Sequence, residues 1–327
     1  MQSQSENLIM TINGYIFNTQ LGFCHSHEHL FIDEGQSSRL VPSLRLDSLE
    51  DTVKELNLFK NYGGASIVDA QPIGCGRNAS NLQIAYSETG VNIIASTGFH
   101  KLIFYPQSHW IHSMSEDQLS DLFIDEIMNG MYIHCDNDAP SSSQRSPIKP
   151  GIIKTASDIN GPIDQYEKYF FAAANASRLT GLPILSHTEM GKGSLEQISL
   201  FTDNGVLADS IILCHLDRNL DDFDYQLEVA KTGVFLELDT IGRFKYHSDE
   251  EEAAFIIKMV SHGYEDKILL GLDCTRERMK SYGNAIGLDY LITTFLPLLK
   301  AYGLKDEIIK KFMIYNPAKA FTIKNRS

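Results

Sequence analysis

Short apolar runs of strand length alternate with helical patterns along this chain of 327 residues. The runs are almost continuously hydrophobic, as is typical of strands buried on both faces of a parallel sheet. They cover residues 22–25, 65–70, 91–96, 151–155, 182–187, 210–215, 233–238 and 267–273. Eight strands that alternate with helices predict an α/β fold of the (β/α)8 TIM barrel type, and a doubly wound open sheet is the alternative.

The segments between these runs carry signals for helices. Segment 48–60 begins with Ser48 as a candidate N-cap, has an acidic first turn and is followed by Gly63 and Gly64. Further helices are predicted at 115–131, 163–179, 195–204, 222–232, 250–262 and 288–302. Since no internal repeat or linker interrupts the alternation, residues 1–327 are expected to form a single domain.

Composition narrows the classes of protein to consider. Hydrophobic residues make up 43% of the chain, which is enough for a sizeable core, and the net charge of −14 disfavours binding to nucleic acid or anionic membranes. The N-terminus lacks a basic region followed by an apolar run, and no apolar stretch has the length of a membrane span. The five cysteines include no C-x-x-C pair, so we expect free thiols in a cytoplasmic protein.

Three histidines alternate in the first predicted strand, where residues 21–30 read LGFCHSHEHL. In a regular strand, the side chains of His25, His27 and His29 would point the same way. Neutral imidazoles on one face can chelate a metal ion. Because the chain has 11 histidines, chance clustering is the alternative, and the metal hypothesis depends on the remaining strands.

Polar residues also end four other predicted strands, namely Lys154, His187, His215 and Asp273. The carboxyl ends of all barrel strands meet at one face, so these residues should converge with His27 and His29. A buried Lys154 needs either a salt bridge to Asp273 or carbamylation by carbon dioxide, because an unpaired buried ammonium is costly. Four imidazoles, a carbamate and a carboxylate would form two adjacent sites for divalent ions.

This order of residues resembles the phosphotriesterase-related branch of the amidohydrolase superfamily. Residues 22–30 resemble its opening motif, residues 151–154 its carbamylated-lysine strand and residues 316–318 its closing helix. The resemblance covers essentially the whole chain and implies a binuclear metal-dependent hydrolase, with zinc expected and manganese or cobalt as alternatives. It places one metal on His27, His29 and Asp273 and the other on His187 and His215, with carbamylated Lys154 and a hydroxide bridging them.

The resemblance also implies the chemistry. The bridging hydroxide attacks a carbonyl or phosphoryl group, and Asp273 is the catalytic residue that accepts the proton. His25 does not match a family ligand, and we interpret it as a residue that supports the site. The family further suggests a homodimer that acts on a small-molecule substrate.

The loops after the seventh and eighth strands contain five cations in an acidic protein, namely Arg243, Lys245, Arg276, Arg278 and Lys280. These loops are a frequent phosphate site in barrels, and guanidinium and ammonium groups suit a phosphate dianion. The alternative is that they are solvated charges paired with neighbouring acids. Similarity to lactonases of phosphorylated sugars implies that Lys245 and Arg276 bind phosphate, with Arg278 and Tyr282 as further candidates.

We therefore predict hydrolysis of a 1,4-lactone of a phosphorylated sugar. A carboxylesterase, an acyl-homoserine lactonase or an organophosphate hydrolase could use the same metal site and would differ only in the pocket. A barrel that keeps metal without catalysis is a third possibility, although a structural site does not need an open coordination position.

Overall fold

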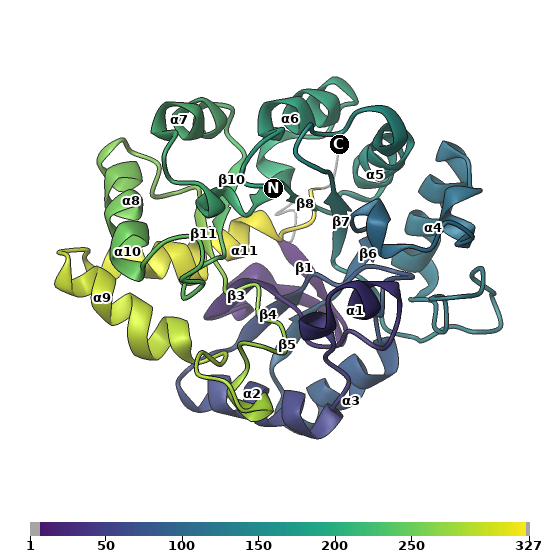
Figure 1. The fold of residues 1–327 in the computed structure, drawn as a ribbon, viewed down its shortest axis with the longest axis horizontal. Coiled ribbons are helices and arrows are strands. Elements are labelled where there is room, and N and C mark those ends of the chain that lie inside the picture. Colours follow the sequence, from purple (N-terminus) through teal and green to yellow (C-terminus); the bar gives the residue numbers. More distant parts are fainter. Residues whose placement is uncertain (1–6, 325–327) are drawn as a thin grey trace, which may run out of the picture.

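The computed structural model describes residues 7–324, in which helices surround a central barrel of parallel strands (Figure 1). The strands of the barrel are β3 (Cys24–Glu28), β4 (Ser66–Asp69), β5 (Asn92–Ile94), β6 (Ser96–Gly98), β7 (Ile152–Ala156), β8 (Ile184–His187), β9 (Ile211–Cys214), β10 (Phe235–Leu238) and β11 (Ile268–Leu270). Every predicted strand is present in the structure. The predicted strand 91–96 corresponds to β5 and the start of β6, which are consecutive pieces separated by Ala95.

Hydrogen bonds close the sheet into a barrel. The strands pair in parallel in the orders β3-β4-β5 and β6-β7-β8-β9-β10-β11. Between the last and first strands, the amide of Asp273 donates to the carbonyl of His27 (3.0 Å), and Ser26 Oγ donates to the carbonyl of Leu270 (2.8 Å). The closed barrel is therefore confirmed over the open sheet, and closure brings His27 and Asp273 next to each other.

Helices cover the outside of the barrel. They are α1 (Gln36–Leu40), α2 (Leu49–Asn61), α3 (Ala79–Thr89), α4 (Glu116–Asn129), α5 (Glu167–Thr180), α6 (Ser194–Asp203), α7 (Phe223–Lys231), α8 (Asp249–Ser261), α9 (Leu296–Ala301), α10 (Asp306–Lys310) and α11 (Asn316–Ala320). The predicted helices are confirmed, most with small shifts of their ends. In the predicted helix 288–302, a π-helix at Leu291–Phe295 precedes α9. Ser48 caps α2 by accepting a hydrogen bond from the amide of Asp51 (3.2 Å).

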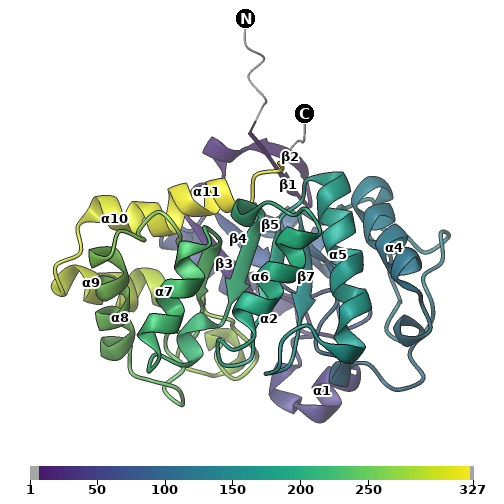
Figure 2. The same cartoon turned by 90° about the horizontal axis from the view of Figure 1, so that it is seen from above.

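Besides the short helices α1 and α10, helix α3 and an N-terminal hairpin were not predicted. Helix α3 begins after Asn78, whose side chain accepts from the amide of Asn81 (2.9 Å), and ends at Gly90, which has φ of 70°. A hairpin of β1 (Leu8–Thr11) and β2 (Gly14–Phe17) precedes the barrel. Figure 2 shows this hairpin at one end of the barrel and α1 at the opposite end.

The side chains inside the barrel change from apolar to polar along its length. Buried apolar side chains from neighbouring strands fill one part of it, among them Val68, Ile94, Ile152, Leu185 and Ile212. The carboxyl ends of the strands instead carry buried polar side chains. The apolar layer therefore forms the base on which the polar residues are held, as expected of a packed barrel core. In the described part of the chain, no helix is long and apolar enough to cross a membrane.

Candidate metal centre and active site

Four histidines and one aspartate lie together at the carboxyl ends of the strands. The ring centroids of His27 and His215 are 5.0 Å apart, and those of His187 and His215 are 4.4 Å apart. His29 Nε2 lies 3.4 Å from Asp273 Oδ1. One possible ligand atom from each of His27, His29 and Asp273 lies within 4.8 Å of the other two. The structure thus brings together residues that lie far apart in the sequence.

Lys154 lies inside this cluster on β7 and is fully buried. Its Nζ is 3.4 Å from His27 Nε2 and 3.9 Å from Cys214 Sγ. Within residues 7–324, no carboxylate lies within ion-pair distance of this ammonium, so the salt bridge to Asp273 that we considered is absent. A buried ammonium without an anionic partner is costly, so Lys154 needs a counter-charge that the described residues do not supply.

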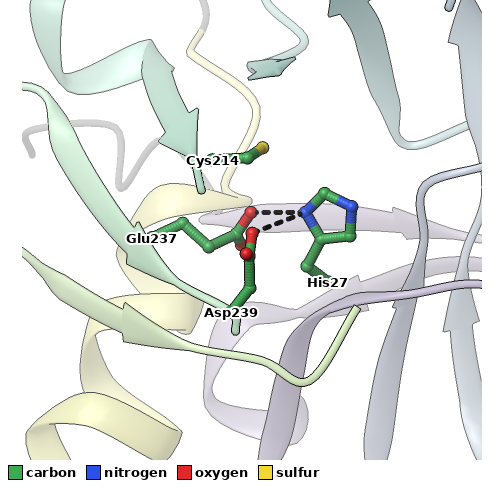
Figure 3. A group of neighbouring side chains, drawn as sticks. All are labelled: His27, Cys214, Glu237 and Asp239. Atoms are coloured by element: carbon green, nitrogen blue, oxygen red, sulfur yellow. Dashed lines mark hydrogen bonds and ion pairs between the residues drawn. The ribbon is translucent and has the colours of Figure 1, made fainter. Parts of the chain in front are cut away.

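Two carboxylates on β10 and the loop after it orient the metal-facing imidazoles. His27 Nδ1 lies 2.7 Å from Glu237 Oε2 and 3.2 Å from Asp239 Oδ2 (Figure 3), and His215 Nδ1 lies 2.7 Å from Asp239 Oδ1. Such contacts place the proton on Nδ1 and leave the Nε2 lone pair free to bind a metal ion. The donor set of imidazole nitrogen and carboxylate oxygen suits zinc and similar divalent ions.

The pKa shifts of the side chains in the cluster bear on their ability to bind a metal ion. Burial lowers the pKa of His187 to about 3 and that of His215 well below its usual value, so both rings are neutral near pH 7. Burial opposes ionisation of Asp273, but the charge of Arg243 and the hydrogen bond with His29 outweigh it and hold its pKa well below the usual range. Burial also lowers the pKa of His29, whereas at His27 the effect of burial is outweighed by neighbouring groups, among them Glu237 and Asp239, and the pKa is raised well above its usual value. His29, His187 and His215 therefore offer neutral imidazoles beside an ionised carboxylate.

The backbone at Asp273 is held in a strained conformation by Glu28. Asp273 has φ of 47°, in the left-handed region that non-glycine residues seldom adopt. The carboxylate of Glu28 accepts hydrogen bonds from the amides on either side, those of Leu272 (2.9 Å) and Cys274 (2.9 Å). Glu28 thereby fixes the direction in which the Asp273 side chain points and acts as a positioning residue.

His25 supports Glu28 from outside the barrel. Its Nδ1 lies 2.8 Å from Glu28 Oε1, and its ring packs edge-on against Phe59 of α2 with centroids 4.6 Å apart. The expectation that three alternate histidines share one face is therefore wrong. The register of β3 against β4 shifts between His25 and Glu28, and such an irregularity breaks the strict alternation of side chains. The interpretation of His25 as a supporting residue agrees with these contacts.

We expect Glu28→Gln to lower kcat at least about tenfold while KM changes less, because glutamine cannot accept from both flanking amides. Steady-state kinetics with the bound metal measured in parallel will show this. Glu55→Gln is the matched control, since buried Glu55 also accepts from two backbone amides, those of Ser281 (2.6 Å) and Leu288 (3.0 Å). An equal loss of kcat in both variants would contradict a positioning role for Glu28.

A cavity of about 270 Å³ opens above the cluster. Its walls include His29, His187, His215 and Asp273 together with four cations, Lys101, Arg218, Arg243 and Lys245. Arg218 and Arg243 each place a guanidinium nitrogen 3.0 Å from Asp273 Oδ2. Lys101 Nζ lies 2.7 Å from Glu189, which also approaches His187 Nε2 (3.4 Å). The cavity thus combines the candidate metal centre with a positively charged wall.

The structure places the predicted phosphate-binding residues in different environments. Lys245 lines the cavity. Arg276 lies outside the cavity wall with a side chain that is 46% exposed, 3.5 Å from Asp47, and its guanidinium lies over the ring of Tyr282 at 4.7 Å. An exposed ion pair of this kind contributes little to stability. Arg276 is therefore a cation beside the cavity, next to Thr275, which does line it.

Arg278 and Tyr282, the further candidates for phosphate binding, lie outside the cavity wall. Arg278 is 4% exposed, and its guanidinium donates to the backbone carbonyls of Leu272 and Ile241, so its donors hold two loops together. The hydroxyl of Tyr282 accepts from the amide of Ser48 (3.0 Å) at the start of α2. Both side chains have structural partners that the spacing of residues in the sequence could not show.

The sequence-based reasoning missed other residues of the site. Arg218 follows His215 by three residues, and the positive φ of 63° at His215 turns the chain there. Glu237 and Asp239 alternate near the end of an otherwise apolar strand, which was a detectable signal for polar side chains inside the barrel. Lys101, three residues after the end of β6, also lines the cavity.

Comparison with known proteins agrees with this geometry. The model of the Phosphotriesterase family matches residues 7–321. A phospho-furanose lactonase of Mycoplasmopsis synoviae is 34% identical over 94% of this chain and 89% of its own. The crystal structure of a lactonase from Listeria monocytogenes superposes with a TM-score of 0.88 at 31% identity, covering 97% of this chain and 100% of that chain. A phosphotriesterase homology protein from Escherichia coli, crystallised with phosphate in its active site, has a TM-score of 0.83 at 29% identity and covers 93% and 99%. The chain therefore belongs to the phosphotriesterase family and is a metal-dependent hydrolase.

Proposed function

We propose that this protein hydrolyses a 1,4-lactone of a phosphorylated sugar. The observation that carries the proposal is the cavity, in which Arg218, Arg243 and Lys245 lie beside the histidine and aspartate cluster. A site that binds metal next to three cations suits a substrate with both a carbonyl group and a phosphate dianion.

The residues of the cluster fit two divalent ions. His27, His29 and Asp273 would hold one, His187 and His215 would hold the other, and Lys154 as a carbamate would lie between them. Zinc is the first choice for this mixture of nitrogen and oxygen donors, with manganese or cobalt as alternatives. When bound, two such ions lower the pKa of a shared water and polarise the substrate carbonyl.

Asp273 would move the proton in this reaction. Its carboxylate is ionised, lies at the cavity and is held in position through the backbone by Glu28. A carboxylate next to the attacking water accepts its proton and can pass it to the ring oxygen that leaves the lactone. The guanidinium groups of Arg218 and Arg243 and the ammonium of Lys245 would bind and orient the phosphate.

The relatives support this choice of substrate over the alternatives. The similar Mycoplasmopsis synoviae protein is a phospho-furanose lactonase, and the Escherichia coli structure contains phosphate in its active site. A neutral organophosphate would gain little from the three cations, and a long acyl chain would favour an apolar cavity mouth. A carboxylesterase, an acyl-homoserine lactonase and an organophosphate hydrolase therefore rank below the phosphorylated lactone.

A panel of 1,4-aldonolactones with and without phosphate tests the proposal. We expect kcat/KM for the phosphorylated lactone to exceed that for its matched neutral lactone by about 100-fold or more, since each charge-assisted hydrogen bond contributes about 1.5–3 kcal/mol. Equal turnover of the two would contradict phosphate recognition. Preferential hydrolysis of simple esters, acyl-homoserine lactones or phosphotriesters would instead favour the corresponding alternative.

A further inference from the structure

Three ionisable side chains form a second buried cluster beside the candidate metal centre. Asp217 follows β9, His247 ends the loop after β10, and Glu252 lies in the first turn of α8. One possible ligand atom from each lies within 4.8 Å of the other two. The side chains of Asp217 and Glu252 are fully buried, and that of His247 is 6% exposed. None of the three belongs to the predicted hydrolytic site.

The two carboxylates of this cluster are poorly satisfied. Neither oxygen of Glu252 has a hydrogen-bond partner, and neither does Asp217 Oδ1, while Asp217 Oδ2 accepts from the amide of Thr240 (2.6 Å). Glu252 Oε2 lies 3.1 Å from His247 Nε2, but the direction of approach is not that of a hydrogen bond. Buried carboxylate oxygens without partners are rare and call for a counter-charge.

The protein supplies no other cation for them. Among residues 7–324, His247 is the only basic side chain within ion-pair distance of Asp217 or Glu252. Nearby Arg218 pairs with Asp273, and Arg278 donates to two backbone carbonyls. Burial, together with the charges of neighbouring carboxylates, raises the pKa of Glu252 well above its usual value. Two adjacent negative charges are therefore costly here unless a cation or a proton accompanies them.

The geometry of His247 favours a cation. Its Nδ1 lies 3.2 Å from the carbonyl of Ser248, to which it can donate a proton. That tautomer leaves Nε2 unprotonated, 3.1 Å from Glu252 Oε2 and 3.3 Å from the hydroxyl of Thr240, with its lone pair available to a metal ion. One imidazole nitrogen and one oxygen from each of the two carboxylates then lie within 4.8 Å of one another. Imidazole nitrogen and carboxylate oxygen are usual ligands of zinc.

We propose that Asp217, His247 and Glu252 bind one divalent cation of the zinc type, separate from the candidate metal centre. The cation ties the loop after β9, which carries Arg218, to the loop after β10, which carries Arg243 and Lys245. It neutralises the buried carboxylates and holds both cationic loops at the cavity. The inference does not rest on the proposed lactonase activity.

Metal stoichiometry tests this site directly. After equilibration with Zn²⁺ and removal of excess ion, we expect three equivalents per wild-type chain and two in both Glu252→Gln and His247→Gln. His262→Gln, at the exposed C-terminal end of the same helix, is the matched control and should retain three. Circular dichroism confirms that each variant is folded. Glu252→Gln keeps the size of the side chain, so it provides the test even if His247→Gln does not fold.

A second measurement separates this site from the hydrolytic one. The variant His27→Asn with His215→Asn removes ligands of the candidate metal centre and should still bind one Zn²⁺ in calorimetric titration. Adding Glu252→Gln to this variant should abolish that binding. The proposal is overturned if wild-type zinc content equals that of Glu252→Gln. It is also overturned if Glu252→Gln has the zinc content of the wild type and a higher melting temperature. In that case a proton shared between Asp217 and Glu252, and not a cation, would neutralise the carboxylates of the wild type.

Discussion

Asp273→Asn is expected to lower kcat for the phosphorylated lactone by at least about 10³-fold. Asparagine cannot accept the proton of the attacking water, a contribution of about 10²–10⁴ for general acid–base catalysis. The substitution also removes the negative charge that faces His29, Arg218 and Arg243. Steady-state kinetics, combined with metal analysis of the purified variant, will measure the effect.

Asp266→Asn is the control for this substitution. Asp266 lies just before the other end of β11, is 54% exposed and pairs with Lys311 (3.0 Å). Its replacement should leave kcat and KM unchanged, as is usual for an exposed ion pair. A kcat for Asp273→Asn within about tenfold of wild type would contradict the assignment of the proton transfer to this carboxylate.

Lys245→Ala should raise KM for the phosphorylated lactone by about tenfold or more and leave kinetics with the neutral lactone unchanged. The estimate corresponds to the loss of one charge-assisted interaction with phosphate, worth about 1.5–3 kcal/mol. Lys245 lies on the cavity wall with its ammonium 4.8 Å from the ring of Tyr246 and has no carboxylate partner in the described chain. Its removal should therefore affect binding far more than folding.

Two cations from the loop after β11 provide the comparison. Lys280→Ala should have no effect, because Lys280 lies outside the cavity and pairs with Asp289 (2.7 Å). Arg276→Ala should raise KM by less than Lys245→Ala, since Arg276 lies beside the cavity and pairs with Asp47. If KM for both lactones rises equally in Lys245→Ala, the lysine acts on the whole substrate and the phosphate assignment is wrong.

The fold could be predicted largely from apolar periodicity. Buried parallel strands need hydrophobic side chains on both faces, and this requirement marked each barrel strand in the sequence. Helix α3 was overlooked although Asn78 and Gly90 carry ordinary cap signals. The irregular register within β3 could not be predicted, because it depends on how the strand pairs with β4 rather than on its own alternation.

The candidate site could likewise be predicted only in part from the sequence. The convergence of His187, His215 and Asp273 followed from the rule that barrel strands end at one face. The hydrogen bonds from the amides on either side of Asp273 to Glu28 could not be predicted. They connect the first strand with the loop after the last strand, and these segments meet only when the barrel closes. The backbone carbonyl partners of Arg278 could not be predicted either, because only the tertiary structure brings Leu272 and Ile241 to its guanidinium.

Removal and return of metal tests the central claim most directly. The protein is treated with a chelator, its metal content is measured, and hydrolysis of the phosphorylated 1,4-lactone is followed before and after Zn²⁺ is restored in the presence of bicarbonate. We predict that turnover falls at least about 100-fold without metal and returns with Zn²⁺, because water near neutral pH is a weak nucleophile without metal ions. Undiminished hydrolysis by the metal-free protein would contradict the account.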